Sequence, residues 1–277
     1  MSLDILGADG LDYAQCHYGA SKLAFRGPAR DLNSPYAVAL GGIDTFGKFV
    51  EVPFCDLFEQ ATGLPMVNMG HANAGVDLFM QDGHVLDICR QAEATVIQVL
   101  GPQNMTNRLY SVHPRRNDRF VRPTKFLETL YRDLDFSQFH YTRHLLTALR
   151  ATSQERYKLV VDELQAAWVG RMQALIKAIR GDIYLLWLSD RPIDDLGQDD
   201  PLGHDPLMVT RSMLEAVKSS VADIVEVVAT RDEIEAGRSR MIYGQLEEPV
   251  AFEMLGPVVH ETVARSLQDA IVPDLGL

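Results

Sequence analysis

The chain has 277 residues, of which 38 are acidic and 26 are basic, so its net charge is −12. This charge disfavours nucleic acid or an anionic membrane as the main partner, because both carry negative charge themselves. No apolar run reaches the roughly 18 residues that a membrane-spanning helix needs, and nothing at the N-terminus resembles a secretion signal. The cysteines are Cys16, Cys55 and Cys89, with no CxxC pair. They predict free thiols in a cytoplasmic globular protein.

From residue 36 onward, short apolar runs that end in or near glycine alternate with helical segments. We expect strands at 36–40, 65–69, 94–100, 181–188 and 221–229, and helices that include 54–62, 75–90 and one after 257. Nearly continuous apolar strands that alternate with helices predict a parallel sheet covered on both faces. The predicted fold is therefore α/β: a doubly wound, five-stranded, mostly parallel sheet of the flavodoxin-like kind, in three layers. Residues 1–34 are expected to be an extension packed on the single domain 35–277.

About 80 residues between the third and fourth strands interrupt this alternation. They contain no good strand pattern; a polar stretch, 105–122, is followed by helical patterns. The last of these, 154–180, places Val160, Leu164, Trp168, Leu175 and Ile179 on one stripe at helical spacing. We predict a helical insertion over about 105–180 near the carboxyl edge of the sheet, where a lid or a dimer contact is common.

Four loops follow the predicted strands or precede the last helix, and ligands of an open parallel sheet bind at such loops. They contain Gly41-Gly42-Ile43-Asp44-Thr45-Phe46-Gly47, Asn68-Met69-Gly70-His71-Ala72-Asn73-Ala74-Gly75, Gly101-Pro102-Gln103-Asn104 and Pro257-Val258-Val259-His260. In this order they resemble the first, second, third and fifth blocks of the SGNH (GDSL-type) hydrolase superfamily. The resemblance spans roughly residues 36–272, apart from the insertion. The chain is also similar to a bacterial family built on that scaffold.

The resemblance implies a serine nucleophile, a histidine base, and an oxyanion site formed by backbone N–H groups and an asparagine. Here Ile43 occupies the nucleophile position, and Pro257 stands where an aspartate would orient the histidine. Asn73 falls on the oxyanion glycine of the second block, whereas the family's asparagine and histidine remain as Asn104 and His260.

Thr45 or Asp44 is the candidate replacement for the serine. A threonine hydroxyl needs an adjacent base, and His260 is the histidine that the resemblance places nearby. In the structural alternative, Thr45 caps the entry of a helix and His260 serves only as a hydrogen-bonding residue in the crevice.

Two further patterns concern anions. Gly42 to Lys48 fits most of a phosphate-binding loop, but Phe49 replaces the magnesium-binding hydroxyl and Pro53 interrupts the helix that should follow. The segment 108–122 carries five arginines against Asp118 alone. Guanidinium groups suit carboxylate, phosphate and sulfate, so we regard Arg115, Arg116 and Arg119, together with His71, as candidate substrate-binding residues. Alternatively, these arginines pair with acids of this chain or of a second subunit.

The resulting prediction is a divergent hydrolase or acyl transferase that acts on an ester or an acylated sugar. Its catalytic candidates are His260, Thr45 and Asp44, with Asn73 and Asn104 at the oxyanion. One alternative is a catalytically silent protein that binds an anion or a carbohydrate. Another is a phosphate or sulfate transferase, which requires Lys48 and the arginines to converge. We expect no cofactor and no metal, because His140 and His144 lack the HExxH context. A homo-oligomer is expected.

Overall fold

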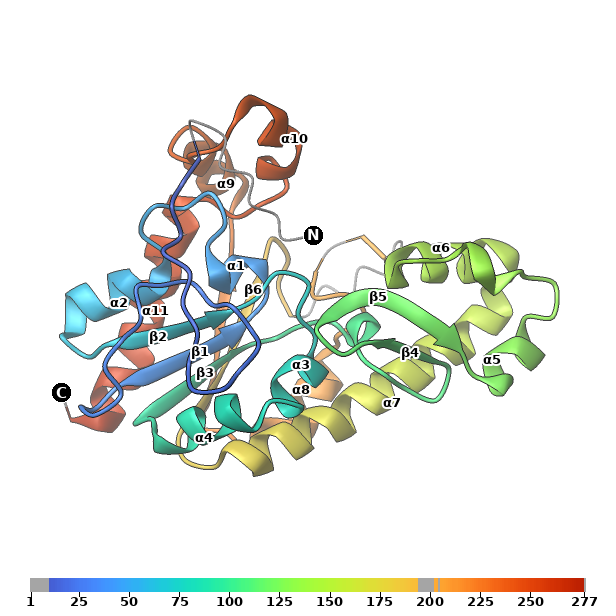
Figure 1. Ribbon diagram of the computed structural model, residues 1–277, viewed down its shortest axis with the longest axis horizontal. Helices are drawn as coiled ribbons and strands as arrows, with labels where there is room; N and C mark the ends of the chain where they lie inside the picture. Colours follow the sequence, from blue (N-terminus) through green and yellow to red (C-terminus); the bar gives the residue numbers. More distant parts are fainter. Residues whose placement is uncertain (1–9, 194–201, 204, 277) are drawn as a thin grey trace.

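The computed structural model describes residues 10–193, 202–203 and 205–276. Its centre is a five-stranded sheet in the order β2-β1-β3-β6-β7, in which every neighbouring pair is parallel (Figure 1). The strands are β1 (Ala37–Gly41), β2 (Met66–Gly70), β3 (Ala94–Gln98), β6 (Ile183–Ser189) and β7 (Asp223–Val228). Without the two intervening strands of the insertion this is the flavodoxin-like order 2-1-3-4-5. The predicted fold class is confirmed.

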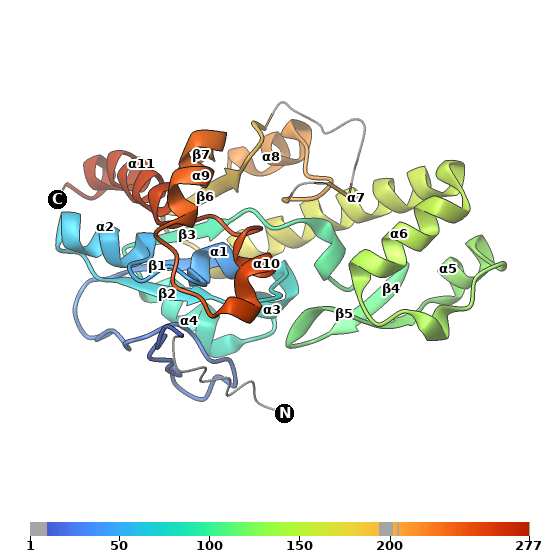
Figure 2. The ribbon, with the colours of Figure 1, turned by 90° about the horizontal axis from the view of Figure 1, so that it is seen from above.

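Successive side chains of the inner strands enter two different cores, which explains why these strands are largely apolar. Val38 and Leu40 belong to one core, and Ala37 and Ala39 belong to the other. On the first face pack α3 (Val76–Met80), α4 (Gly83–Gln91), α7 (Gln154–Ile179) and α8 (Arg211–Lys218). On the second face pack α2 (Phe54–Thr62) and α11 (Pro257–Leu275) (Figure 2). The result is three layers.

The first loop forms one short helical turn and then reverses. Helix α1 covers only Ile43–Phe46 and ends at Gly47, whose φ of 73° is the left-handed conformation that glycine adopts without strain. No helix therefore starts at Lys48, and the phosphate-loop pattern lacks the helix N-terminus that would hold a phosphate. Helix α2 begins after Pro53, which supplies no backbone N–H, and ends at Gly63 with φ 76°.

The insertion contains a β-hairpin, so the prediction that it has no strand is wrong. Strands β4 (Tyr110–His113) and β5 (Arg116–Pro123) pair in antiparallel orientation. Tyr110, Val112 and Phe120 are buried, whereas Arg115 and Arg116 at the turn face solvent. In β5 the buried residues Asn117 and Phe120 are three positions apart, so the sequence shows no regular alternation there. Helices α5 (Lys125–Leu130), α6 (Thr142–Thr152) and the first half of α7 share a separate core with the hairpin. Figure 1 shows these elements as an arm that projects from the sheet.

The helix predicted over 154–180 is present as α7, and all five residues of its apolar stripe are buried. The remaining elements are the single-turn helices η1 (Pro102–Asn104), η2 (Phe136–Gln138) and η3 (Gln245–Glu247), and the helices α9 (Arg231–Arg238) and α10 (Glu248–Ala251). Residues 10–34 lie against the domain and add Tyr18, Leu23 and Phe25 to the first core. Residues 1–9 of the predicted extension lie outside the described residues.

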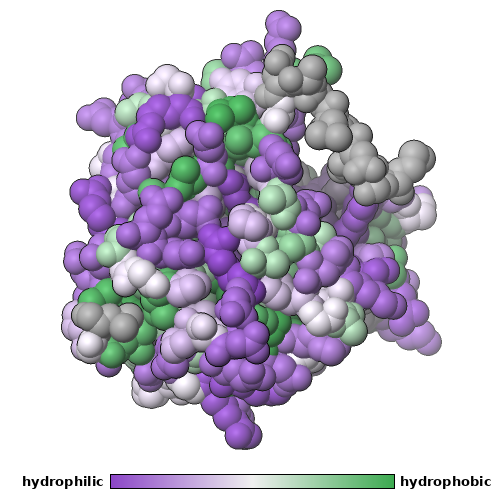
Figure 3. All heavy atoms as spheres, turned by 60° about the vertical axis from the view of Figure 1, so that its left-hand side comes forward, coloured by the Kyte–Doolittle hydropathy of each residue, from purple (hydrophilic) through white to green (hydrophobic). Residues whose placement is uncertain are grey.

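None of the described helices combines the length and the apolarity that crossing a bilayer demands. On the face drawn in Figure 3, hydrophilic residues cover most of the surface and hydrophobic ones form only small patches.

Candidate functional site

A cavity of about 190 Å³ lies at the carboxyl ends of β1, β3 and β6. Ligands of a doubly wound sheet bind at this edge, where the direction of the chain connections reverses. The lining comes from the first loop (Gly42, Ile43, Asp44), the second (Asn73, Ala74), the third (Gln98, Val99, Leu100, Gly101, Gln103, Asn104) and the segment after β6 (Leu188, Asp205, Pro206). Three of the four loops chosen from the sequence therefore meet here.

Gln98, the last residue of β3, forms hydrogen bonds with three residues of the first loop. Its side-chain oxygen accepts hydrogen bonds from the Gly42 N–H at 2.9 Å and from the Thr45 hydroxyl at 2.7 Å. Its side-chain nitrogen donates to the Asp44 carboxylate at 3.1 Å. Two donors fix which end of the amide is the oxygen. The side chain is buried, so the direction of the Asp44 carboxylate is set from inside the sheet.

Asp44 is the cavity's candidate base. Burial raises the pKa of this carboxyl to about 6, because desolvation disfavours the charged form, and the nearby charge of Asp205 adds to the rise. Hydrogen bonds from Gln98 and from the backbone of Leu255 partly oppose the shift of the pKa. At neutral pH the group is therefore a carboxylate that takes up a proton more readily than an ordinary aspartate does.

Besides Asp44, three lining residues carry N–H groups that can donate to a ligand: Ile43, Asn73 and Asn104. The backbone N–H of Ile43 is at the start of α1, where N–H groups have no acceptor within the helix. Asn73 adopts φ 63°, a left-handed conformation that asparagine tolerates, so the missing glycine does not prevent this loop shape. The Asn104 side-chain oxygen accepts from the Thr142 hydroxyl at 2.7 Å, which leaves its NH₂ group as the free end.

Thr45 and His260 do not meet at this cavity. Thr45 is fully buried and donates its hydroxyl to Gln98, not to a histidine. His260 is also buried: its Nδ1 accepts from the Phe54 N–H at 3.0 Å and its ring stacks on Phe54. Burial, with a smaller contribution from the positive charge of Arg26, lowers the pKa of His260 to about 3. The imidazole is therefore neutral and belongs to the packing behind the first loop.

The candidate anion-binding residues do not line the cavity either. Arg115 and Arg116 are exposed at the hairpin turn, and the Arg119 guanidinium lies 4.4 Å from the ring centre of Tyr141. Lys48 pairs with Glu247 at 3.4 Å. The His71 imidazole contacts the carbonyl of Ala72, and its pKa is lowered by burial and by Arg116. The convergence of Lys48 with the arginines that a phosphate transferase requires is not present.

Three polar residues of the cavity were not among the predicted site residues: Gln98, Gln103 and Asp205. Gln98 could have been predicted from the sequence, because a polar residue at the end of a buried parallel strand lies at the edge of the sheet where ligands bind. Gln103 donates toward Asp205 at 3.5 Å, while its side-chain oxygen has no partner among the described residues. Asp205 comes from a turn-rich segment whose position only the folded chain reveals.

These features define an α/β protein with a doubly wound parallel sheet and a polar cavity at its ligand-binding edge. The chain belongs to the family described as a domain of unknown function, DUF6473, which matches residues 1–275. No curated protein matches the chain.

Several solved structures are similar to the chain, all at low sequence identity. A carbohydrate esterase family 2 enzyme from Corynascus thermopiles (Myceliophthora fergusii) is 12% identical, with a TM-score of 0.45 over 91% of this chain and 69% of the other. A lipase from a goat rumen metagenome is 10% identical, with a TM-score of 0.46 over 86% and 97%. An acetylxylan esterase from Geobacillus stearothermophilus is 14% identical, with a TM-score of 0.41 over 86% and 94%.

Proposed function

We propose that the protein hydrolyses a small neutral ester with Asp44 as general base. The observation that carries this proposal is that Asp44 lines the same cavity as Ile43, Asn73 and Asn104. These residues carry a carboxylate, two backbone N–H groups and a side-chain NH₂. An ester carbonyl needs donors for the negative charge that develops on its oxygen, and the attacking group needs a base. Ile43 removes the covalent route, so water is the nucleophile.

The chemistry balances without a serine. Water attacks the acyl carbon while its proton passes to the Asp44 carboxylate, and the oxyanion that forms accepts from the three N–H donors. The tetrahedral intermediate then expels the alcohol, which receives the proton from the Asp44 carboxyl group. An alcohol in place of water would make the same site an acyl transferase.

The substrate proposed for this site is an acylated sugar or another polyol ester. Two acceptors in the cavity support it: the Gln103 side-chain oxygen, which is buried and without a partner among the described residues, and the carboxylate of Asp205. Hydroxyl groups of a polyol can donate to both. The carboxylates of Asp44 and Asp205 would repel a negatively charged substrate, which favours a neutral one.

The test is the hydrolysis of 4-nitrophenyl acetate by the wild-type protein, Asp44→Asn and His260→Gln. We expect Asp44→Asn to lower kcat/KM by roughly 100-fold or more, the usual loss for a general base, and His260→Gln to retain activity. The wild-type kcat/KM should rise with pH and reach half of its maximum near pH 6, the pKa of Asp44. Activity that depends on His260 and survives in Asp44→Asn would contradict this assignment.

A second candidate is a binding protein that keeps the cavity without turnover. Ile43 at the nucleophile position and the burial of His260 favour it. In that case no variant changes the background rate, while an intact acylated sugar raises the thermal midpoint of the wild type and not that of Gln103→Leu.

A further inference from the structure

Two elements of the arm touch the loops that line the cavity, and we call their first residues the base of the arm. Strand β5 begins beside α3, the helix that follows the second loop (Figures 1 and 2). Its second residue, Asn117, is fully buried, and Thr142, the first residue of α6, is 2% exposed. Polar side chains that are buried this deeply need hydrogen-bond partners. Both residues find theirs in loops of the sheet domain.

Asn117 holds the second loop, which contributes Asn73 and Ala74 to the cavity. Its backbone N–H donates to the carbonyl of Asn73 at 3.1 Å. Its side-chain oxygen accepts from the backbone N–H groups of Gly75 and Leu78, both at 3.0 Å. These groups belong to the N-terminus of α3, where N–H groups have no acceptor within the helix. Asn117 therefore caps α3 from a different part of the chain.

Thr142 holds the third loop through a side chain of the cavity. Its hydroxyl donates to Oδ1 of Asn104 at 2.7 Å, and Asn104 is one of the cavity-lining residues. The buried hydroxyl of Tyr110 in β4 donates to the Gln103 carbonyl of the same loop at 2.8 Å. The second and third loops also meet directly, since a Cβ atom on Gly75 would overlap the carbonyl oxygen of Asn104. Both loops are therefore held against the base of the arm.

Strand β5 also fixes the position of Thr142. The Phe120 N–H donates to the carbonyl of His140 at 3.1 Å, two residues before Thr142. Arg119 forms an isolated antiparallel bridge with Tyr141. The same strand therefore carries both the contact to the second loop and the segment that presents Thr142 to the third loop.

We infer that Thr142 is a positioning residue of the cavity, presented by the arm, that fixes the direction of the Asn104 NH₂ group. The inference rests on the proposed function, in which this NH₂ group is one of three donors to the oxyanion. The two ends of an amide are nearly alike in shape, and a hydroxyl that donates to the oxygen leaves the nitrogen end for the ligand. A donor lowers the barrier most when it is oriented before the reaction begins. The arm thereby acts on the site through its base.

The kinetic test measures hydrolysis of 4-nitrophenyl acetate by Thr142→Val, which keeps the shape of the side chain and removes its hydroxyl. We expect kcat to fall about 10-fold while KM changes little, because the oriented donor acts in the transition state. Thr142→Ser keeps a hydroxyl and should restore most of the rate. Thr152→Val is the matched control: it removes a hydroxyl that donates to the Ala148 carbonyl within α6, and it should match the wild type.

A double-mutant cycle separates positioning from a general loss of stability. Because Thr142 acts through Asn104, Thr142→Val should have no further effect on kcat when it is added to Asn104→Ala. Circular dichroism verifies that each variant is folded. A kcat of Thr142→Val that stays at the wild-type value would overturn the inference. So would a loss of the same size in the Asn104→Ala background.

The orientation of Asn104 can also be followed without turnover. In the NMR spectrum of the ¹⁵N-labelled full chain, the side-chain NH₂ signals of Asn104 are those that disappear in Asn104→Ala. Their order parameter should fall from about 0.85 in the wild type to below about 0.6 in Thr142→Val, and stay unchanged in Thr152→Val. An unchanged order parameter in Thr142→Val would overturn the inference, whether or not the ester is hydrolysed. A lowered order parameter in a protein without hydrolysis that depends on Asp44 would overturn the proposed function alone.

Discussion

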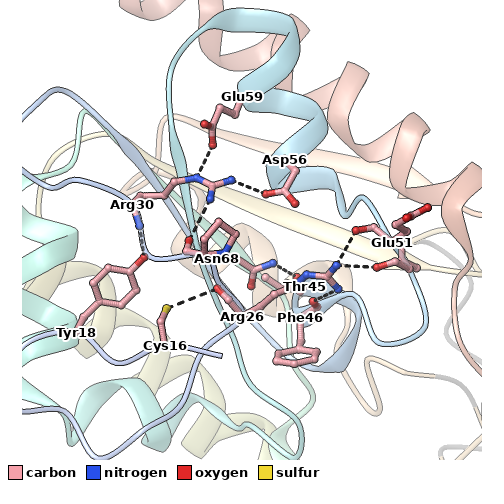
Figure 4. A network of polar contacts seen from close by, with 12 residues as sticks. Cys16, Tyr18, Arg26, Arg30, Thr45, Phe46, Glu51, Asp56, Glu59 and Asn68 are labelled. Atoms are coloured by element: carbon pink, nitrogen blue, oxygen red, sulfur yellow. Dashed lines mark hydrogen bonds and ion pairs between the residues drawn. The ribbon is translucent and has the colours of Figure 1, made fainter. Parts of the chain in front are cut away.

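The first loop, residues 42–51, has two sides that use polar groups in opposite ways. On the cavity side, Asp44 keeps a carboxylate and Ile43 keeps a backbone N–H for a ligand. On the other side, the Arg26 guanidinium is buried and all its contacts are internal. It donates to the carbonyls of Phe46, Gly47, Val50 and Glu51, at 3.3, 2.6, 2.8 and 2.8 Å (Figure 4).

The difference shows that the internal contacts of Arg26 and the groups that line the cavity lie on separate sides of the same loop. Arg26 comes from the N-terminal extension, and the same extension binds α2 through Arg30, which pairs with Asp56 at 2.7 Å and with Glu59 at 2.6 Å (Figure 4). His260 packs on this structural side as well, near enough to Arg26 for the charge to lower its pKa. The contacts of Arg26 thus lie behind the loop, and on the cavity side Gln98 orients the Asp44 carboxylate.

Replacement of Arg26 should have the largest effect on this arrangement. Arg26→Met leaves four carbonyls without their donor in a buried site, so we expect a loss of about 3 kcal/mol or more in the free energy of unfolding. Arg30→Met is the matched control on the same extension. Its ion pairs are partly solvated and should cost only about 1 kcal/mol. Urea denaturation measures both, and equal losses would show that Arg26 is no more than a surface contact.

His260 should make the free energy of unfolding decrease as the pH is lowered. Its pKa is about 3 in the folded protein, whereas an unperturbed histidine in the unfolded chain has a pKa of 6.5. The unfolded state therefore binds the proton more strongly, and stability that is complete above pH 6.5 falls as the pH decreases toward 3. At pH 5 this contribution amounts to a loss of about 2 kcal/mol relative to pH 7.5. His260→Gln keeps an acceptor for the Phe54 N–H but does not titrate.

Urea denaturation of both proteins at pH 7.5 and pH 5 isolates this contribution, because all other groups titrate equally. The wild type should lose about 2 kcal/mol more than His260→Gln. An identical decline in both would mean that the imidazole is solvated and lies outside the packing behind the loop.

The contribution of Asp44 to the free energy of unfolding should depend on pH in the opposite direction from that of His260. It should also be the smallest of these effects. The pKa of Asp44 rises from 3.8 to about 6 on folding, so the folded state binds the proton more strongly. Stability from this group is complete below pH 3.8 and is lost as the pH rises through 6. The carboxylate is partly solvated, so Asp44→Asn should gain about 1 kcal/mol at pH 8 and nothing at pH 4. Destabilisation at pH 8 would show that the Asp44 carboxylate supports the fold instead of straining it.

The strands and most of the helices could be predicted because the spacing of their apolar residues shows which side chains are buried. Apolar runs such as 94–100 enter two cores, and the stripe of α7 repeats at helical spacing. The hairpin of the arm could not be found in this way. Its buried residues Tyr110, Val112 and Phe120 pack against α5, α6 and α7, which follow later in the chain. In β5 the buried residues Asn117 and Phe120 are three positions apart, so the strand lacks the regular alternation that identifies a strand in a sequence.

The sequence by itself determined the α/β fold, the edge of the sheet where the cavity lies, and the absence of a hydroxyl side chain at position 43, since each follows from local pattern and residue type. Only the tertiary structure decided the roles of the individual side chains. In the folded chain the Thr45 hydroxyl donates to Gln98, and His260 accepts from the backbone N–H of Phe54. Asp44 lies close enough to Asp205, 161 positions further along the chain, for the charge of Asp205 to raise its pKa. Hydrogen-bond partners and desolvation depend on residues that are distant in sequence, and the order of residues does not specify them.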